Sequence, residues 1–528
     1  MDHPISKTMS KAEPGDAIEH GDTIAVETQS LSGQAAEVQL HRTLRTRHLS
    51  MIGLGASIGL GLWLGSGQSL RTGGPAALLI GYCLAGSVVW SVSQSIGEMA
   101  ILYPLPSAFV QWTSKFVDPA AAFALGWSYW FHAWITIANE LQGVLTVLSF
   151  WQDSAPRVAI LISFWALIFF INIWAVNVFA EVEFVAAVIK FGWIFVVLVS
   201  FIVISAGGAP NHVAVGFRYW NEAAFTNGFK GLLMILPTCI FAMASSENIG
   251  MVVAETRNPL KSTPPAVRAV WIRLSIFYIF GALAVTITVD PKDSRLFGGS
   301  GSTGASPFVI AYQNGQLMPL AHMMNAIIFI SVISAGSIAA YAGSRTLFMQ
   351  KADSRGRPWF ALVSTVFMGG ALSFLNLNAT GAEVFTWLSS LASLTTLFSW
   401  SMICLSHIRM RYAWKVQGRS PAELPWTNGS WPLSAYWGLG CCIILLVAEF
   451  YIAVWPLGKT PSAVGFFSRF VSAIAILVIY VAARCYYRGR RWVNVREVDL
   501  DNDRRFYHVE DQAEKSTPWI DRLRKRTS

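Results

Sequence analysis

Two stretches rich in small and polar residues interrupt apolar parts of the sequence. The first, GASIGLGLWLGSG, covers residues 55–67 and contains five glycines. The second, PTCIFAMASSENIGMVVAETRNP, covers residues 237–259 and places Ser245, Ser246 and Glu247 deep in an apolar run. A helix that unwinds at such a point exposes N–H groups, which favour anions, and carbonyl groups, which favour cations. Together the two stretches predict a site for a small ligand that carries both charges.

Each stretch also has a purely structural interpretation. Gly55 and Gly59 are four residues apart, which is the spacing of a small-residue face where two helices pack closely. Glu247 can equally be a carboxylate that is held by hydrogen bonds between helices. A helix broken inside a membrane persists only where a cavity or a ligand satisfies the freed backbone groups. The residues alone leave both interpretations open.

Further ionisable residues lie in apolar runs. They are Glu140, in WITIANELQG, and Lys190, in VFAEVEFVAAVIKFGW. A charged side chain inside a membrane span is costly and is a functional candidate by default; a lysine there suits either a fixed internal cation or a proton carrier. Glu181 and Glu183 precede Lys190 and are expected near the inner membrane surface, in contact with solvent. His132 is expected in a helix core or at an interface rather than in a proton relay.

Membrane helices have to position these residues. Of the 528 residues, 54% are hydrophobic and only 13% are charged, and the mean hydropathy is +0.47. A soluble domain usually carries about twice that charged fraction. Apolar runs of the length that a bilayer requires recur along the chain and predict an all-α integral membrane protein with about twelve transmembrane helices. The predicted spans are 49–70, 76–102, 120–150, 157–179, 182–207, 229–255, 268–289, 320–349, 359–377, 383–407, 434–455 and 465–486.

The distribution of Lys and Arg predicts the orientation. Clusters of basic residues alternate with loops that hold only scattered ones, which places both termini in the cytosol. Residues 1–47 are expected to form a disordered cytosolic tail, residues 48–487 the transmembrane domain, and residues 488–528 a cytosolic tail that is charged and flexible from residue 492. The formal net charge of +9 then reflects membrane topology, so we expect a lipid bilayer and no nucleic acid as a partner.

The sequence carries no signature of catalysis. The six cysteines lie in or beside apolar runs and lack the spacing of zinc ligands. A nucleophile elbow and a Walker loop are also absent from the sequence, so we expect neither enzymatic activity nor a metal or cofactor. The Pro- and Trp-rich stretch 421–437 is expected to fold as an inner connection. Asn378 lies in an Asn-Ala-Thr glycosylation sequon in a short outer loop.

An ordered set of motifs resembles fungal plasma-membrane amino-acid permeases of the amino acid–polyamine–organocation superfamily. The set begins with LRTRHLSMIGLGASIGLGLWLGSGQSLRTGGPAALLIGY and spans about residues 44–488. It continues with SIGEMAILYP, FVDPAAAFALGWSYWF, AEVEFVAAVIK, VVAETRNPLKSTPPAVR, ASPFVIAYQNG, SRTL and HIRMRYAWKVQGRSPAELP.

This resemblance implies a fold like that of the leucine transporter, with two inverted five-helix repeats followed by two extra helices. It also implies an amino-acid substrate that is imported across the plasma membrane together with protons. Carried over residue by residue, the cradle for the substrate carboxylate falls on Ala56, Ser57, Ile58, Gly59, Leu60 and Gly61. The carbonyls facing the substrate ammonium and the gating aromatic fall on Phe241, Ala242, Met243 and Ala244, with Ser245 beside them. The acids and the lysine that the resemblance connects with coupling or gating fall on Glu140, Lys190 and Glu247.

The sequence departs from the family pattern at several positions. Leu60 stands where a threonine is usual, Ser245 where a glycine is usual, and Ser337 where an asparagine is common. After Leu347 roughly ten residues seen in the family are missing, which is enough to change how a loop packs.

Two alternatives stay open from the sequence. A permease-like sensor would bind amino acids without transporting them, although it would have no need for Lys190, Glu140 and Glu247. A related carrier of choline, GABA or polyamines is a closer alternative. The amino acid itself and the oligomeric state are not readable from these residues.

Overall fold

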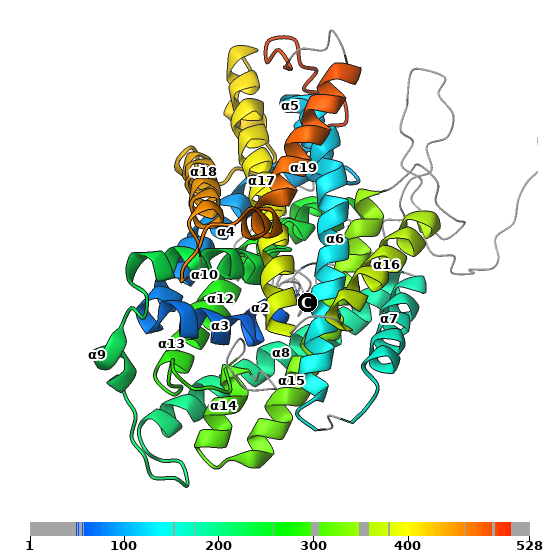
Figure 1. The fold of residues 1–528 in the computed structure, drawn as a ribbon. Helices are drawn as coiled ribbons and strands as arrows, with labels where there is room; N and C mark the ends of the chain where they lie inside the picture. The colour runs from blue at the N-terminus through cyan, green and yellow to red at the C-terminus, as the bar shows by residue number, and fades with distance from the viewer. Residues whose placement is uncertain are drawn as a thin grey trace, which may run out of the picture. The chain divides into compact units, whose positions relative to one another are not determined.

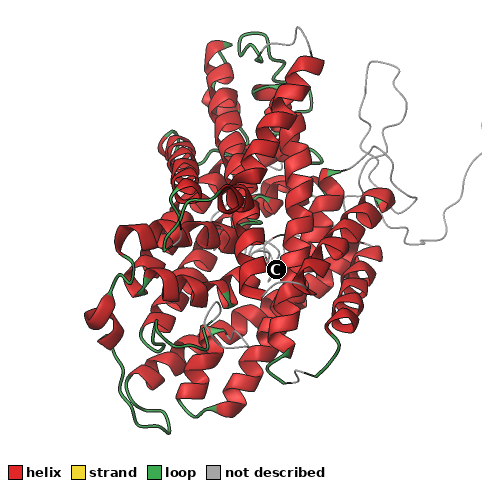
Figure 2. Cartoon of the chain, viewed as in Figure 1, coloured by secondary structure: helices red, strands yellow, loops and turns green. Residues whose placement is uncertain are grey.

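A computed structural model describes residues 49, 51, 55, 58–151, 154–174, 176–256, 258–296, 306–347, 358–377, 381–458, 460–487 and 492–507. All of them belong to the larger of two units, Val38–Ser528. Within these ranges the chain is helical without a strand, as Figure 2 shows, and one isolated bridge pairs Ala206 with Ala214. The all-α class expected from the hydropathy pattern is confirmed for this part of the chain.

The helices follow one another along the chain as coloured in Figure 1. They are α2 (Leu60–Trp63), α3 (Gly65–Gly73), α4 (Pro75–Leu102), α5 (Ala108–Phe116), α6 (Pro119–Leu148), α7 (Arg157–Ile173), α8 (Val176–Ser205), α9 (Arg218–Ala223), α10 (Gly228–Met243), α11 (Asn248–Ala254), α12 (Pro259–Arg273), the π-helix η1 (Leu274–Phe280), α13 (Gly281–Thr286), α14 (Pro307–Asn314), α15 (Met318–Thr346), α16 (Trp359–Ser373), the 3-10 turn η2 (Phe374–Leu377), α17 (Gly381–Val416), the 3-10 turn η3 (Pro421–Glu423), α18 (Leu433–Val454) and α19 (Ala463–Tyr486).

Local sequence explains where several helices begin. At α6, Asp118 accepts a hydrogen bond from the backbone N–H of Ala120 at 3.3 Å, and Pro119 takes the first helical position. At α14, Ser306 and Pro307 play the same two parts. A capping oxygen satisfies an N–H that has no partner within the helix, and proline has no N–H to leave unsatisfied there.

Eight helical segments in the described residues are long and apolar enough to cross a membrane. They are Pro75–Leu102, Val178–Ser205, Gly228–Ala254, Pro259–Thr286, Met318–Thr346, Glu383–Val416, Leu433–Val454 and Ala463–Tyr486. In the most apolar 18-residue stretch of α19, only 6% is buried by protein. In the corresponding stretch of α17 the buried share is 78%. An apolar helix face that protein leaves uncovered requires lipid, so α19 is expected to lie at the periphery and α17 in the interior.

The helix bounds differ from the apolar runs at their polar ends. Helix α8 begins at Val176 instead of residue 182, α12 begins at Pro259 instead of residue 268, and α17 continues to Val416 instead of ending at 407. These added turns contain charged residues such as Glu181, Lys261 and Arg411. Hydropathy locates only the apolar part of a helix, and the helix itself continues into the polar region beyond it.

The long helix α6 organises the packing. It contacts α15, α16, α17 and α19 along its length, as can be followed from its cyan ribbon in Figure 1. Helix α10 contacts α2, α3, α4 and α17. Helices α2 and α3 of the first predicted stretch therefore lie beside α10, which holds the start of the second, with α2 next to α6 and α10 next to α17.

Part of the predicted flexible tail is packed instead. Tyr103 Oη donates to the carbonyl of Leu500 at 2.7 Å, and the N–H of Arg505 donates to the carbonyl of Leu102 at 3.0 Å. Leu500 is only 1% exposed. Residues 492–507 thus lie against the end of α4, and the prediction of a flexible chain from residue 492 was wrong for them. The charged composition of this segment predicted flexibility, although its Leu500 side chain is buried.

The Pro- and Trp-rich connection is folded, as expected. Its Asn428 is only 4% exposed, and its N–H donates to Glu98 Oε2 at 3.3 Å. Glu98 on α4 also binds Arg411 of α17, with 2.8 Å between Nη2 and Oε2. The connection after α17 is therefore held against α4 through this carboxylate.

Candidate functional site

The backbone is not helical at Ile58 and Gly59, immediately before α2. Gly55 still has helical geometry, Gly59 is extended with φ −140° and ψ −151°, and α2 begins at Leu60. The N–H of Leu60 donates to the carboxylate of Glu140, at 3.1 Å to Oε2 and 3.3 Å to Oε1. Glu140 is 3% exposed and reaches this break from α6. The freed end of α2 thus faces a buried carboxylate, which is the charge that a helix N-terminus favours.

Two glycines set how closely other elements approach this break. A Cβ on Gly59 would lie 2.6 Å from Glu140 Oε1 and 2.8 Å from the Cβ of Ala335 on α15. A Cβ on Gly61 would lie 2.6 Å from the Cα of Ala242 on α10. Neither position has room for a side chain. The glycine-rich motif therefore allows α2 to touch α6, α15 and α10 at once.

Lys190 lies among carbonyl groups at the same break. Its Nζ donates to Ser334 Oγ at 2.8 Å, to the carbonyl of Ile58 at 3.3 Å and to that of Gly55 at 3.4 Å. The residue is 0% exposed. Unwound helix carbonyls favour cations, and here the ammonium group of the chain itself takes that place.

A second carboxylate meets this lysine through a hydroxyl group. Ser334 Oγ donates to Glu183 Oε2 at 2.5 Å, and Glu183 is 2% exposed. The expectation that Glu183 contacts solvent was therefore wrong, whereas Glu181 is exposed. The two acids are two residues apart on a helix, so they point to nearly opposite sides of α8.

The other broken helix unwinds between α10 and α11. Helix α10 ends at Met243, Ser245 has φ +73°, and α11 begins at Asn248. Glu247 lies within this segment and is 0% exposed. Its Oε1 accepts from Tyr129 Oη at 2.8 Å and from the N–H of Ser245 at 3.2 Å, and its Oε2 accepts from Trp400 Nε1 at 3.0 Å. Glu247 thus fixes the unwound segment against α6 and α17.

Several carbonyls before the second break already have donors. Tyr278 Oη donates to the carbonyl of Ala242 at 2.6 Å, and Ser246 Oγ donates to that of Met243 at 3.1 Å. The N–H of Ala244 donates to the carbonyl of Phe241 at 3.2 Å. The ring of Phe241 packs edge-on against Phe385 of α17, with 5.9 Å between centroids. The carbonyls of Phe241, Ala242 and Met243 thus each accept a hydrogen bond from the chain itself.

A buried arginine adds a positive charge near the second break. Arg273 of α12 is 0% exposed, and its Nη2 donates to Ser246 Oγ at 2.5 Å. Further along, the carboxylate of Glu255 binds Arg345 Nε at 2.9 Å, and the guanidinium lies 3.8 Å from the centroid of the Tyr341 ring. This ion pair joins the residue that follows α11 to the end of α15.

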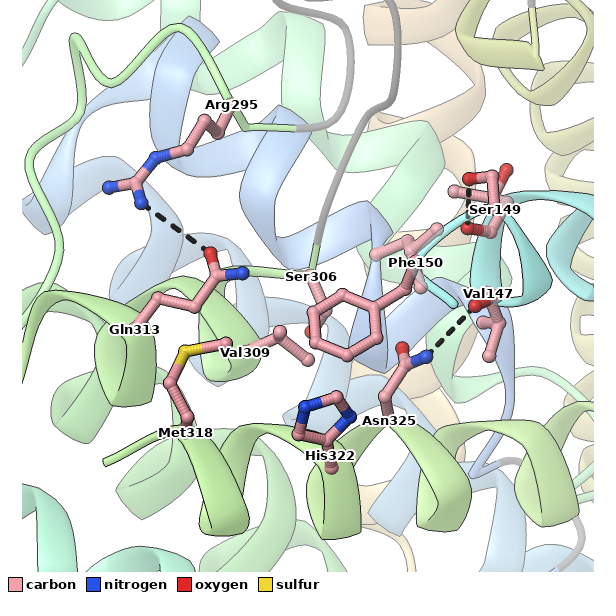
Figure 3. Close-up of a pocket in the computed structure, with 12 residues that line it drawn as sticks. Val147, Ser149, Phe150, Arg295, Ser306, Val309, Gln313, Met318, His322 and Asn325 are labelled. Carbon is pink, nitrogen blue, oxygen red and sulfur yellow. Dashed lines mark hydrogen bonds between the residues drawn. The ribbon is translucent and has the colours of Figure 1, made fainter. Parts of the chain in front are cut away.

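A cavity of about 310 Å³ lies among residues from the end of α6 and from α14 and α15, with Leu64, which follows α2, also lining it (Figure 3). Its lining residues are Leu64, Thr146, Val147, Ser149, Phe150, Arg295, Ser306, Val309, Gln313, Met318, His322 and Asn325. Asn325 Nδ2 donates to the carbonyl of Val147 at 2.8 Å, and His322 Nδ1 accepts from Trp151 Nε1 at 2.9 Å. Its size suits a small polar molecule.

Arg295, which lines this cavity, forms an ion pair with Asp293. Arg295 Nη2 lies 2.6 Å from Asp293 Oδ2. Partial burial raises the pKa of Asp293, but hydrogen bonds from the Arg295 side chain and backbone outweigh it and lower that pKa below its usual value. Asp293 therefore stays ionised and holds the arginine across the neutral and mildly acidic range.

The structure brings together some of the predicted site residues and separates others. Glu140, Lys190, Ile58, Gly59 and Leu60 meet at the first break. Glu247 lies at the second break with different partners, and its contacts suit the structural interpretation as well as a functional one. Ala56 and Ser57 lie outside the described residues, as do Asn378 and the shortened connection after Leu347. His132 is 4% exposed on α6, which fits the expected core position.

Two functional candidates, Ser334 and Glu449, were not found from the sequence, and a third, Glu183, was expected at the wrong place. Glu183 lies seven residues before Lys190, a spacing that places both on one helix face within about 20° and that could have revealed the pair. Ser334 gave no signal, because serines are common in such helices. Glu449 of α18 is 4% exposed and accepts from Ser393 Oγ at 3.0 Å; as a carboxylate within the predicted span 434–455, it carries the same sequence signal as Glu140.

Comparison with known proteins identifies the family of the chain. Residues 48–494 match the family model described as amino acid permease. The chain belongs to the amino acid permease family. Members of this family are transporters, so the chain is a membrane transporter of this kind and not an enzyme.

Several curated members of the amino acid permease family are similar over most of their length. The general amino-acid permease GAP2 of Candida albicans is 35% identical over 91% of this chain and 84% of its own length. The probable amino-acid permease meu22 of Schizosaccharomyces pombe is 36% identical over 87% and 83%. The general amino-acid permease GAP1 of Saccharomyces cerevisiae is 34% identical over 91% and 83%. These similarities support amino-acid transport.

Proposed function

We propose that this protein imports amino acids across the plasma membrane by proton symport, with alternating access around the two helix breaks. The observation that carries the proposal is the arrangement at the first break. There, the N–H of Leu60 faces the buried carboxylate of Glu140 while Lys190 fills a site made of helix carbonyls. This arrangement provides a place for a carboxylate, a place for a cation and titratable groups that connect them.

The proposed binding mode follows from the polarity of the two breaks. The substrate carboxylate binds at residues 56–61, and the substrate ammonium faces the carbonyls of residues 241–244, with Ser245 and the ring of Phe241 beside it. Gly61 and Ala242 are in contact across these segments, which supports a single site shared by both. Because Glu140 accepts the Leu60 N–H, a substrate carboxylate that binds this N–H displaces Glu140.

The proposed architecture extends this arrangement to the whole chain. It comprises twelve transmembrane helices with both termini in the cytosol, arranged as two inverted five-helix repeats and two extra helices. The positions of the breaks support it, because the first and sixth spans are equivalent in two five-helix halves.

Uptake in a fungal strain that lacks its main amino-acid permeases tests the proposal. Labelled amino acids are offered singly at acidic and near-neutral external pH, with and without an uncoupler. We expect uptake that is faster at acidic pH and collapses with the uncoupler. Lys190→Ala and Glu140→Gln are expected to abolish that acceleration, whereas Lys415→Ala, at an exposed position on α17, is expected to leave it intact.

A permease-like sensor is the second candidate function. The departures from the family pattern at Leu60 and Ser245 support it, because both residues lie at the breaks. If the protein reaches the plasma membrane and no amino acid accumulates, transport is refuted and the sensor is favoured. Binding of an amino acid to the purified protein without uptake is its expected signature.

A further inference from the structure

We propose that Glu183 is the second proton-carrying group of this transporter and that it exchanges a proton with Lys190 through the hydroxyl of Ser334. This inference rests on the proposed proton symport and assigns to it a residue that lies outside the substrate site. Two consecutive hydrogen bonds carry it, both between side chains buried in the described part of the chain.

The first step is the geometry of the chain of hydrogen bonds. Lys190 Nζ donates to Ser334 Oγ at 2.8 Å, and Ser334 Oγ donates to Glu183 Oε2 at 2.5 Å. Lys190 and Glu183 share one face of α8, and Ser334 faces them from α15. A hydroxyl is both a donor and an acceptor, so one serine can receive a proton from the lysine side as it gives its own to the acid.

The transfer balances without any other reactant. The lysine ammonium gives one proton to Ser334 Oγ, and the original hydroxyl proton of Ser334 passes to Glu183 Oε2. A charged amine and a carboxylate become a neutral amine and a carboxylic acid, and Ser334 is unchanged. The reverse transfer restores the ion pair. Burial reduces the free-energy advantage of the ion pair over the neutral pair, because a buried pair gains attraction but loses hydration.

Glu183 also has an unsatisfied atom. Its Oε1 makes no hydrogen bond to any described residue, although it is buried. A buried carboxylate oxygen without a partner is costly, and Glu183 relieves that cost when it takes up a proton. In the proposed orientation Glu183 lies about two turns nearer the cytosol than Lys190. It is therefore placed to pass the proton on to the inner side.

The charges around the pair support an isolated relay. Lys190 is the charged group that acts on Glu183, and Glu183 and Glu140 act on Lys190. Helix α8 packs against α7, α13, α14, α15 and η1. Their other ionisable residues among those described are Arg157, Tyr278, Tyr312, His322, Tyr341 and Arg345. Of these, Arg345 is engaged by Glu255 at 2.9 Å.

The relay then links the substrate site to the proton. Lys190 lies between Glu140, which holds the Leu60 N–H, and Glu183, which lies behind Ser334. When a substrate carboxylate displaces Glu140, the balance of charge around Lys190 changes. Glu183 responds to that change without touching the substrate, so it is a positioning and coupling residue and not part of the binding site.

The test uses the full-length protein in liposomes and a mixture of radiolabelled proteinogenic L-amino acids. Three quantities are measured: exchange against the same mixture inside, accumulation driven by an acidic exterior, and acidification of the lumen reported by a trapped pH dye. Glu183→Gln and Ser334→Ala are compared with Glu181→Gln, a matched substitution at an exposed carboxylate of the same helix. Glu183→Asp tests rescue by a shorter acid.

We expect Glu183→Gln and Ser334→Ala to exchange amino acids yet to reach an inside-to-outside ratio of only about one, because a carrier without coupling merely equilibrates its substrate. Lumen acidification is lost with accumulation, Glu183→Asp restores part of both, and Glu181→Gln behaves as wild type. Accumulation by Glu183→Gln at the wild-type level overturns this inference and leaves proton symport standing. Loss of exchange as well, without rescue by Glu183→Asp, overturns it in favour of a structural role. Absence of accumulation by the wild type overturns both proposals.

Discussion

The backbone N–H of Leu60 donates to both carboxylate oxygens of Glu140, at 3.1 Å and 3.3 Å, across a break in the helix. Gly59 borders this contact, and a methyl group there would lie 2.6 Å from Glu140 Oε1 and 2.8 Å from the Cβ of Ala335. The carboxylate can rotate away, but the Cβ of Ala335 is fixed by the backbone of α15. A side chain at position 59 would therefore force α2 and α15 apart and disturb the contact between Leu60 and Glu140.

Gly59→Ala is expected to lower amino-acid uptake at least about tenfold, because a shift of about 1 Å in a positioned group costs up to 100-fold. Gly192→Ala is the control: it lies in α8, and no atom lies within 4 Å of its added methyl group. Uptake of both variants is compared at equal surface expression. Wild-type uptake by Gly59→Ala would show that the close approach at this break is dispensable.

Ser245→Gly is expected to stabilise the protein by about 1 kcal/mol, because a left-handed backbone costs an L-residue about 1–2 kcal/mol and glycine nothing. Ser245 has φ +73° at the position where the family resemblance places a glycine. Thermal unfolding of the purified protein, followed by tryptophan fluorescence, measures the change. Ser245→Ala keeps the strained backbone and should not raise the midpoint; equal gains in both variants would refute a backbone origin.

Glu247→Gln is expected to destabilise the protein by about 1–3 kcal/mol, the cost of a buried group left without its partner. Trp400 Nε1 can only donate a hydrogen bond. The single oxygen of a glutamine amide can accept either from Trp400 or from Tyr129 Oη and the N–H of Ser245, but not from both sides. Trp400→Phe removes one of these donors.

In the double variant of Glu247 and Trp400 the loss should therefore be smaller than the sum of the single losses. Glu383→Gln, at an exposed carboxylate of α17, is the control. Strict additivity in thermal unfolding would argue against this coupling.

The packed C-terminal segment has a predictable response to pH. Hydrogen bonding from Arg419 lowers the pKa of Asp501 below its usual value, with 2.7 Å between Arg419 Nη1 and Asp501 Oδ1. Because the folded-state pKa is below the unfolded one, the stabilising contribution is complete above the usual aspartate value of about 4 and is lost as the pH falls through the lowered pKa. The pair is solvent-exposed, so the contribution is small.

Hydrogen–deuterium exchange of residues 492–507, corrected for intrinsic rates, checks this. Protection is expected to be equal at about pH 7 and about pH 5 and to fall only below about pH 4. Asp501→Asn should show the reduced protection already at neutral pH. A fall in wild-type protection between neutral and mildly acidic pH would contradict the assignment and would point to another titrating group.

Sequence reasoning located both helix breaks, because glycines in one helix and a Ser-Ser-Glu sequence in the other are rare in apolar runs. It also identified Glu140 and Lys190, since charge in an apolar run is visible without a structure. It misjudged Glu183, because hydropathy marks the distance along a helix from its polar end but not which side of the helix faces protein. It missed Ser334 and the anchoring of Leu500, because a serine or a leucine becomes informative only when its partner from a distant part of the chain is known.

The contact between Tyr103 and Leu500 joins residues 397 positions apart in the sequence. At a synthesis rate of about 5–20 residues per second, roughly 20–80 s pass between the appearance of the two residues. During that time the end of α4 has been made and lacks the segment that covers it in the finished protein. The segment around Leu500 therefore completes its contact with α4 long after α4 has been made, and a chain terminated before residue 492 carries an uncovered Tyr103.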